Sequence, residues 1–219
     1  MKLSTDTIAV LKNFSEINQN ILFKPGKNVQ TMSTMKNILA EAEVSEQFDS
    51  EFAIYDLPEF IRSVELLESP ELKFNGSGYV NLSNKSQNLK YFFSDKSVIV
   101  SPTKSIKLPD EYVSFVLTKD NFSKFMKGVT ALNLPDIAVK GDGKKIKIIA
   151  NDKKNKTSNT YSVDIGETDK EFTAFFKTEN FKQIPDDYDV VISKAKISHF
   201  VNRNKNVKYW IALEPDSEF

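Results

Sequence analysis

The sequence contains no cysteine, which excludes a thiolate nucleophile, a zinc site with cysteine ligands and a structural disulfide. It contains one histidine, His199, so no second histidine can complete a zinc site. Net charge is lacking too, because the 30 basic and 30 acidic side chains cancel. A histone-like basic coat is therefore excluded, and any contact with nucleic acid has to be local.

Long apolar runs are also absent. The start of the chain, residues 1–6, has no apolar run behind a basic residue, and nowhere do about 18 apolar residues stand together. We therefore expect neither export by a standard signal nor a membrane-spanning segment. The 40% of hydrophobic residues and the 17 phenylalanines indicate a buried core, and 219 residues fit one large domain or two small ones.

Catalytic motifs are missing as well. The sequence has no dinucleotide, Walker or kinase signature. Asp186, Asp187 and Asp189 follow Pro185 and could hold magnesium, but a solvated turn is the favoured interpretation. We therefore predict that the protein is not an enzyme and needs no cofactor or metal.

The sequence does contain a pattern that recurs four times. Each copy has a short apolar strand, a polar capping position and the spacing of an amphipathic helix, and the copies begin near Leu3, Phe52, Phe115 and Phe175. This pattern predicts one short helix followed by a run of strands in every quarter of the chain.

Helix signals are clearest in the first three copies. Ser4 or Thr5, Asp56 and Thr118 can cap the three helices. Pro185 shortens the fourth helix, because proline lacks a backbone N–H. The buried stripes are predicted to be Val10, Leu11, Phe14 and Ile17, then Phe60, Ile61, Val64 and Leu67, then Phe122, Phe125, Met126, Val129 and Leu132.

Between the helices the hydrophobic period changes to two, as antiparallel strands with one buried face require. Hairpins are expected around Gly76 and Gly78 and around Gly141 and Gly143. The expected fold class is α+β with antiparallel sheets, and further strands are expected at 89–93, 98–100, 161–165, 190–193 and 207–213.

A domain boundary is predicted in the segment 101–110, which contains two prolines and several polar residues. The first domain is then 1–110, with 101–110 as its connector, and the second is 111–219. Each domain holds two of the four copies.

With these features the chain resembles the DNA polymerase sliding clamps, above all those of T-even-like tailed bacteriophages. The motifs that carry the resemblance are the opening 1–14, the segment Ala53–Leu57 and the ending Ala212–Ser217. The resemblance implies a homotrimeric ring of six similar domains, with helices lining the hole and sheets outside. A head-to-tail interface that closes after three copies gives such a ring.

The resemblance also implies the function and the partners. The ring would encircle double-stranded DNA without reading its sequence and tether the replicative DNA polymerase for processive synthesis. An ATP-driven clamp loader and late transcription factors would be further partners, no membrane would be involved, and the protein would act in the cytoplasm of the infected bacterial host.

Three sets of site residues are predicted. Cations on the helices would face the duplex: Lys12, Arg62, Lys119, Lys124, Lys127 and Lys182. Two edge strands would close the ring: Val98, Ile99 and Val100 in one chain with Tyr161, Val163 and Ile165 in the next, although either could be an interior strand. Short apolar tails of partner proteins would dock on Ile106, Leu108, Leu213, Pro215 and Phe219, unless Ile106 and Leu108 only pin the connector.

Two other classes of protein stay open at this point. A β-rich oligomeric viral structural or assembly protein would share the composition and the lack of catalytic residues. The second class, a metal-dependent nuclease, is disfavoured because the sequence has no convincing carboxylate cluster. A helix repeated in every quarter favours the clamp over both.

Overall fold

The computed structural model describes residues 1–74, 76, 78–103 and 106–219. The chain divides into two compact units, Met1–Ser105 and Ile106–Phe219. Lys104 and Ser105 of the predicted connector lie outside the described residues, and the domain boundary at residue 110 stays a prediction.

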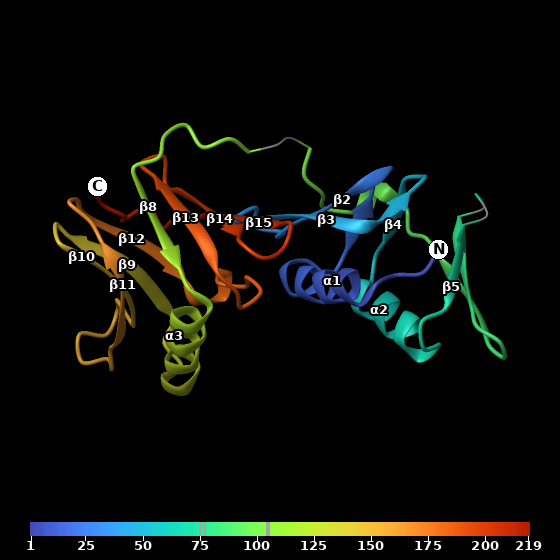
Figure 1. Ribbon diagram of the computed structural model, residues 1–219, viewed down its shortest axis with the longest axis horizontal. Helices are drawn as coiled ribbons and strands as arrows, with labels where there is room; N and C mark the ends of the chain where they lie inside the picture. Colours follow the sequence, from blue (N-terminus) through green and yellow to red (C-terminus); the bar gives the residue numbers. More distant parts are fainter. Residues whose placement is uncertain (75, 77, 104–105) are drawn as a thin grey trace. The chain divides into compact units, whose positions relative to one another are not determined.

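In the described residues of the first unit, two helices lie side by side and the strands form three antiparallel groups: β1 with β4, β2 with β3, and β5–β6–β7 (Figure 1). Its elements are α1 (Thr5–Ile17), β1 (Ile21–Phe23), β2 (Gly26–Met32), β3 (Ile38–Phe48), β4 (Phe52–Ile54), α2 (Leu57–Leu66), β5 (Glu71–Phe74), β6 (Tyr79–Ser83), β7 (Asn88–Phe92) and the 3-10 turn η1 (Lys96–Val98).

The second unit contains one α-helix and two antiparallel strand groups, β8–β13–β14–β15 and β11–β10–β9–β12. Its elements are β8 (Val113–Leu117), α3 (Lys119–Leu132), β9 (Asp136–Asp142), β10 (Lys145–Asn151), β11 (Tyr161–Glu167), β12 (Glu171–Lys177), the 3-10 turn η2 (Thr178–Asn180), β13 (Tyr188–Ser193), β14 (Ile197–Asn202) and β15 (Val207–Ala212).

The helix starts follow the sequence signals. Ser4 accepts a hydrogen bond from the N–H of Thr7, Asp56 from that of Glu59, and Thr118 from that of Asn121. The predicted apolar stripes are buried except for Met126, which is half-buried, and Leu132, which is 39% exposed. Both predicted hairpins are present as β5–β6 and β9–β10, although residues 75 and 77 of the first turn lie outside the described residues.

The helix predicted for the fourth quarter is wrong. Only the 3-10 turn η2 forms there, and the chain then runs irregularly through Pro185 to β13. Proline cannot donate a backbone hydrogen bond, so a helix started at Thr178 cannot continue through this position. Among the described residues, no helix is long and apolar enough to span a membrane.

Each unit is filled by large side chains shielded from solvent. Phe14, Phe23 and Phe60 occupy the core of the first unit, and Tyr188 and Tyr209 that of the second. Replacing any of these with alanine would leave a cavity in the core, and we expect it to lower the free energy of unfolding by about 3–5 kcal/mol. Both units therefore have their own hydrophobic core.

Gly128 lets α3 approach β11 closely. A Cβ atom at this position would overlap the ring of Tyr161, the first residue of β11. We expect Gly128→Ala to lower the free energy of unfolding by about 1–3 kcal/mol, although alanine in a helix interior normally stabilises by roughly 1 kcal/mol. Denaturant unfolding of the variant measures this change.

Gly166→Ala is the matched control for this variant. Gly166 lies on β11, the strand of Tyr161. A Cβ atom at Gly166 would only reach ordinary van der Waals contact with Ile146, at 4.0 Å. The control should unfold like the unmodified protein. A Gly128→Ala protein as stable as this control would show that α3 and β11 do not depend on the close approach.

Candidate nucleic-acid interface and subunit edges

The exposed faces of α1 and α2 carry more acidic than basic side chains. Lys12 on α1 forms an ion pair with Glu65 on α2, with 2.5 Å between Nζ and Oε1. Arg62 is exposed one turn before Glu65. These are the two basic residues of the two helices, whose acidic residues are Asp6, Glu16, Glu59 and Glu65. The first unit therefore presents predicted DNA contacts, but on a face with an acidic excess.

The exposed face of α3 is basic. Lys119, Lys124 and Lys127 are exposed, and Asp120 is the one acidic residue within the helix. Lys124 donates to Asp120 across 2.7 Å, and this hydrogen bond raises the pKa of Lys124 above its usual value. With three basic side chains and one acidic one, α3 has a net positive exposed face.

Lys182 does not lie on a helix. It follows η2 and is half-buried. It therefore joins the predicted DNA-binding set from an irregular segment, and the set comes from three α-helices and this segment rather than from four helices.

The three aspartates that could hold magnesium each have a partner within the chain, through a hydrogen bond or an ion pair. Asp186 is buried, and although burial raises its pKa, the hydrogen bond from Asn204 brings that pKa below the usual value. Asp187 accepts from the backbone N–H of Lys119 at 2.7 Å, and Asp189 pairs with Arg203. Within the described ranges, no group of three or more acidic or histidine side chains could hold a metal ion.

Tyr161, Val163 and Ile165 lie on β11, as predicted, and β11 is the last strand of its sheet. It is paired with β10, with Ile148 opposite Val163. The edge at the far side of the same sheet is covered, because Glu218 of the C-terminal segment forms a bridge with Thr173 on β12. Residues 214–218 are held there by several contacts: Glu214 N–H to Phe175 O, Phe175 N–H to Ser217 Oγ, and the Lys153–Asp216 ion pair.

The prediction of a strand at Val98, Ile99 and Val100 is wrong. Asp95 caps the 3-10 turn η1, and the N–H of Ile99 donates back to Lys96. The backbone of Val100 bonds to two side chains from a distant part of the sequence, because its N–H donates to Asn20 and its C=O accepts from Asn18. These bonds occupy the groups that a ladder with a neighbouring strand would need.

The structure instead presents β7 as an edge strand of the first unit. Among the described residues, β7 is paired with β6 alone, whereas Met1 exchanges backbone hydrogen bonds with Leu72 and so covers β5 at the other end of the sheet. Tyr91 of β7 donates to the C=O of Asp56, and burial raises the pKa of this tyrosine to about 12. The strand is thus held against the start of α2 by one face.

The opposite face of β7 is exposed and carries Asn88, Lys90 and Phe92. Phe92 is 66% exposed and lies 5.7 Å from the ring of Tyr79, and Nζ of Lys90 lies 3.8 Å from that ring. The sequence had indicated a strand here. It carried no signal that this strand, and not 98–100, would be left at an edge.

The five residues predicted for peptide docking differ in their exposure. Ile106 and Leu108 are half-buried, Pro215 is exposed, and Leu213 is buried in the core. Phe219 packs edge-on against Tyr112, with 5.4 Å between the ring centroids.

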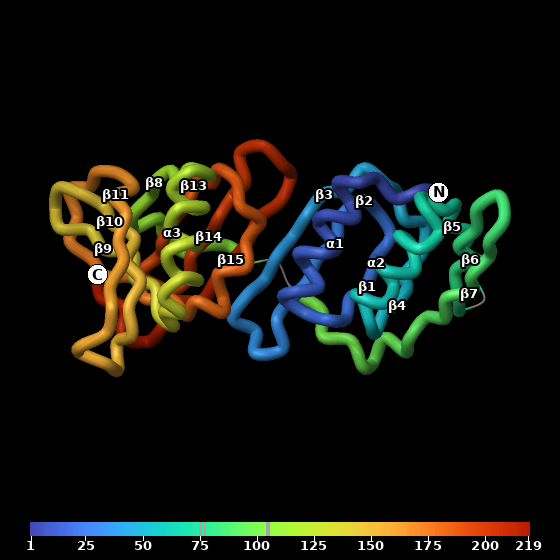
Figure 2. The backbone as a smooth tube through the Cα atoms, turned by 90° about the horizontal axis from the view of Figure 1, so that it is seen from below, coloured from blue at the N-terminus to red at the C-terminus, as the bar shows by residue number. Residues whose placement is uncertain are grey.

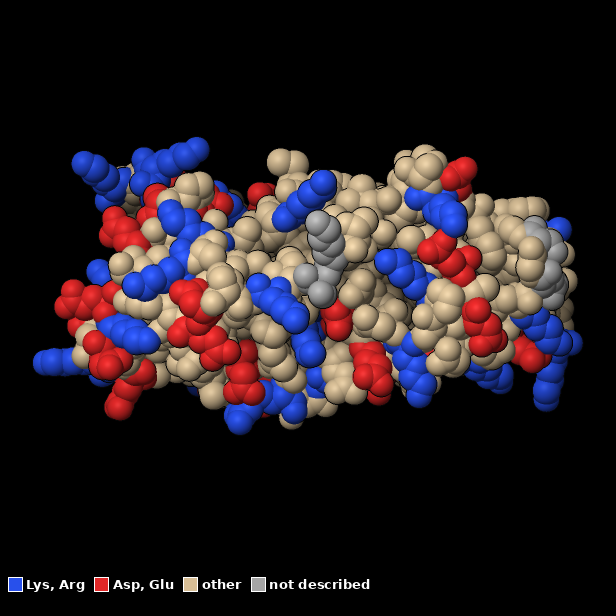
Figure 3. Space-filling view, turned by 90° about the horizontal axis from the view of Figure 1, so that it is seen from above, with Lys and Arg blue, Asp and Glu red and all other residues tan. Residues whose placement is uncertain are grey.

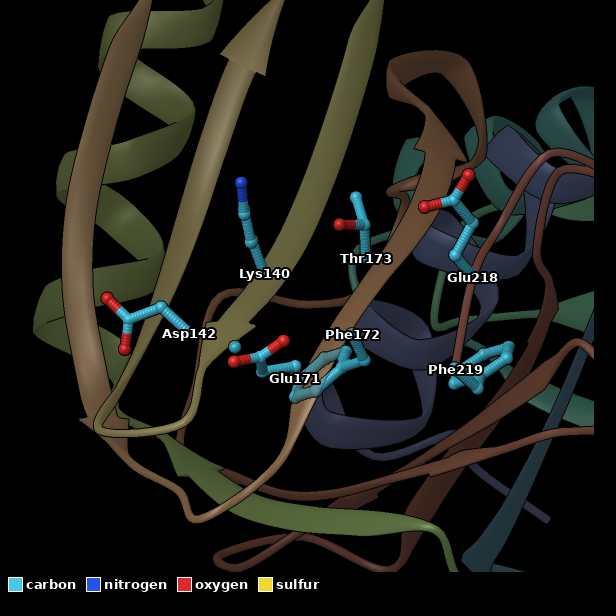
Figure 4. A pocket seen from close by; sticks show the side chains of 8 residues that line it. Lys140, Asp142, Glu171, Phe172, Thr173, Glu218 and Phe219 are labelled. Carbon is cyan, nitrogen blue, oxygen red and sulfur yellow. The ribbon is translucent and has the colours of Figure 1, made fainter.

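Phe219 also lines a depression of about 520 Å³ between β9, β12 and the C-terminal segment (Figure 4). Lys140 is the one basic side chain in its lining, beside the carboxylates of Asp142, Glu171 and Glu218. On the face of the molecule seen in Figure 3, blue and red side chains are interspersed, without a broad region of one sign.

Comparison with known proteins gives concordant results for both halves. Residues 4–101 match the family described as DNA polymerase processivity factor, and residues 114–215 match the family described as gp45 sliding clamp, C terminal. The sliding clamp of Vibrio phage KVP40 is 30% identical, over 98% of this chain and 99% of the relative.

Solved structures with a similar fold come from more distant organisms. The proliferating cellular nuclear antigen, PCNA, of Entamoeba histolytica has a TM-score of 0.69 at 17% identity, covering 94% of each chain. The PCNA of A. fulgidus, solved with the C-terminal region of FEN-1 bound to it, has a TM-score of 0.69 at 14% identity, covering 96% of each chain.

Proposed function

Because this chain belongs to the family of phage sliding clamps, the processivity factors of DNA polymerases, we propose that three copies form a ring around duplex DNA. The similarity over 98% of the chain to a sliding clamp carries this proposal. The ring would tether the replicative polymerase, be placed on DNA by an ATP-driven loader, and serve late transcription factors. All of this would take place in the cytoplasm of the infected bacterium.

Ring closure would use the edges of β7 and β11. The strand β11 of one chain would pair with β7 of the next, so that the sheets continue across the interface and neither edge stays exposed. Exposed charges of opposite sign support this pairing, since β7 carries Lys90 and β11 carries Glu167. The predicted contribution of Val98, Ile99 and Val100 is thereby replaced by β7.

The DNA would be held by topology rather than by affinity. A closed ring cannot leave a duplex sideways, so its contacts only have to keep the phosphates centred. Lysine suits this role because it is a flexible point charge without the bidentate grip of arginine. Lys119, Lys124 and Lys127 would supply most of this contact, with Lys12, Arg62 and Lys182 contributing less.

We also propose that short apolar tails of the polymerase and the loader dock on the connector. The structure of A. fulgidus PCNA with the C-terminal region of FEN-1 bound to it supports binding through a C-terminal segment. We expect Ile106→Ser with Leu108→Ser to weaken binding of a polymerase C-terminal peptide at least about tenfold, because apolar anchors carry most of a peptide's affinity. Calorimetry of the peptide with the full protein measures this.

Two controls define the result. The mass of the double variant must stay that of the unmodified protein, and Phe219→Ser, at the C-terminal depression, tests the other predicted end of the site. Unchanged affinity in the connector variant would place the docking site elsewhere on the chain.

The function itself is tested by DNA synthesis on a primed single-stranded circle. With the cognate polymerase and loader, adding the protein should lengthen the products made in a single binding event. If the products keep their length, the protein does not act as the clamp of that polymerase.

A further inference from the structure

The helices alone give each chain no net positive charge toward DNA. On α1 and α2 the acidic side chains outnumber the basic ones by two, and on α3 the basic side chains outnumber the acidic one by two. Lys12 and Lys124, moreover, each pair with a carboxylate. If phosphates are to be attracted, further cations have to lie near these helices.

The loop 152–160 between β10 and β11 supplies such cations. It contains Lys153, Lys154 and Lys156, and its one acidic residue is Asp152. Lys153 is engaged by Asp216. Lys154 and Lys156 are exposed, and no carboxylate of the described residues lies within 4.0 Å of either ammonium group.

The loop has a defined shape. Asp152 accepts from the N–H of Lys154 at 2.9 Å, and Asn155 accepts from the N–H of Thr157 at 3.1 Å. At the base of the loop, the N–H of Lys153 donates to the buried carboxylate of Asp136 at 3.0 Å. These hydrogen bonds order the backbone of the loop that presents the exposed Lys154 and Lys156.

The loop lies beside α3. Tyr161, which follows the loop directly, packs on α3 at Phe125, 6.3 Å between ring centroids, and on Gly128. Figures 1 and 2 both place the loop at the flank of α3, on the side of the sheets where α3 lies. Lys124 lies one turn before Gly128, which packs on Tyr161, so it is on the flank of the helix that faces β11.

We propose that Lys154 and Lys156 form one phosphate-binding surface with Lys124 and Lys127, and we name these four residues the α3–loop surface. The inference rests on the proposed function, since it takes the DNA duplex as the ligand. The α3–loop surface contacts the sugar-phosphate backbone, not the bases, because four flexible ammonium groups offer no pattern that distinguishes base edges. The second unit thereby supplies most of the attraction of each chain for DNA.

The test measures binding of the full-length protein to a fluorescently labelled 30-base-pair duplex at a series of KCl concentrations. We expect Lys154→Gln with Lys156→Gln to bind at least about fivefold more weakly at low salt. The slope of log K against log salt should also shrink by roughly 0.9 for each phosphate that the variant no longer neutralises. Glutamine keeps the turns, since Asp152 and Asn155 remain in place.

Lys140→Gln with Lys144→Gln is the matched control. It removes the same charge from the same sheet, but at the β9–β10 end, opposite to the loop. This control should keep the affinity and the salt slope of the unmodified protein, and both variants should keep its mass and melting temperature.

Two outcomes would overturn the proposal. Equal affinity and slope in the two variants, with the unmodified protein still binding DNA and extending products on a primed circle, would refute the α3–loop surface and leave the clamp function intact. Failure of the unmodified protein in both assays would refute the proposed function as well.

Discussion

Replacing Phe92 with aspartate is expected to turn the ring into soluble monomers of 24.9 kDa. Phe92 is 66% exposed within its own chain, so the substitution should leave the fold of the first unit intact. In the proposed ring this side chain is buried against β11 of the next chain. Burial of a phenylalanine contributes about 1.5–3 kcal/mol, and a carboxylate buried without a partner costs more.

Light scattering measures the result. The unmodified protein should have a mass of about 75 kDa, three times that of the chain, and Phe92→Asp that of one chain. The substitution weakens every interface of the ring in the same way, so the effect on assembly is multiplied by three. Products on a primed circle should then shrink to those of the polymerase alone.

Tyr55→Asp is the control for this substitution. Tyr55 is 64% exposed and lies in the same unit, between β4 and α2, so its ring is as accessible as that of Phe92 but lies on neither edge strand. It should remain trimeric. A trimeric Phe92→Asp protein, with or without a monomeric Tyr55→Asp protein, would remove β7 from the interface.

A second large effect is expected from Lys124→Glu with Lys127→Glu. Both side chains lie on the exposed face of α3, and reversing them turns the basic excess of this helix into an acidic one. Repulsion from the phosphates should shorten products on a primed circle at least about tenfold, with the trimer mass unchanged. The same reversal at Lys140 and Lys144 is the control.

Removing the cations of α1 and α2 in the first unit should have a smaller effect than removing those of α3. Lys12→Gln with Arg62→Gln removes two cations from a face that is already acidic and where Lys12 is paired with Glu65. It should therefore shorten products less than Lys124→Gln with Lys127→Gln. The reverse order would assign the main DNA contact to the first unit.

The sequence predicted what depends on neighbouring residues. The caps at Ser4, Asp56 and Thr118 bond to N–H groups three residues away, so each helix start could be identified from a few adjacent side chains. The hairpin around Gly141 and Gly143 is equally local. In both cases the determining contacts lie within one turn.

What the sequence did not predict depends on distant residues. Val98, Ile99 and Val100 have the composition of a strand, yet Asn18 and Asn20, some 80 residues away, take the backbone groups of Val100. The pairing of Lys12 with Glu65 likewise needs the packing of α1 on α2.

Which strand ends a sheet is also a tertiary property, because it depends on where the chain termini lie. Met1 covers β5 and Glu218 covers β12, and this leaves the opposite edges, β7 and β11, without a neighbour in the described part of their sheets. No local pattern in the sequence distinguishes these two strands from interior ones.

The central claim, a closed ring around DNA, is tested most directly by retention of the labelled protein on circular DNA. The protein is loaded onto a nicked plasmid by its loader, free protein is removed by gel filtration, and half of the sample is cut once with a restriction enzyme. We predict that the protein stays with the circular plasmid and leaves the linear one by sliding off its ends. Equal retention on both forms, or loss from both, would contradict the account.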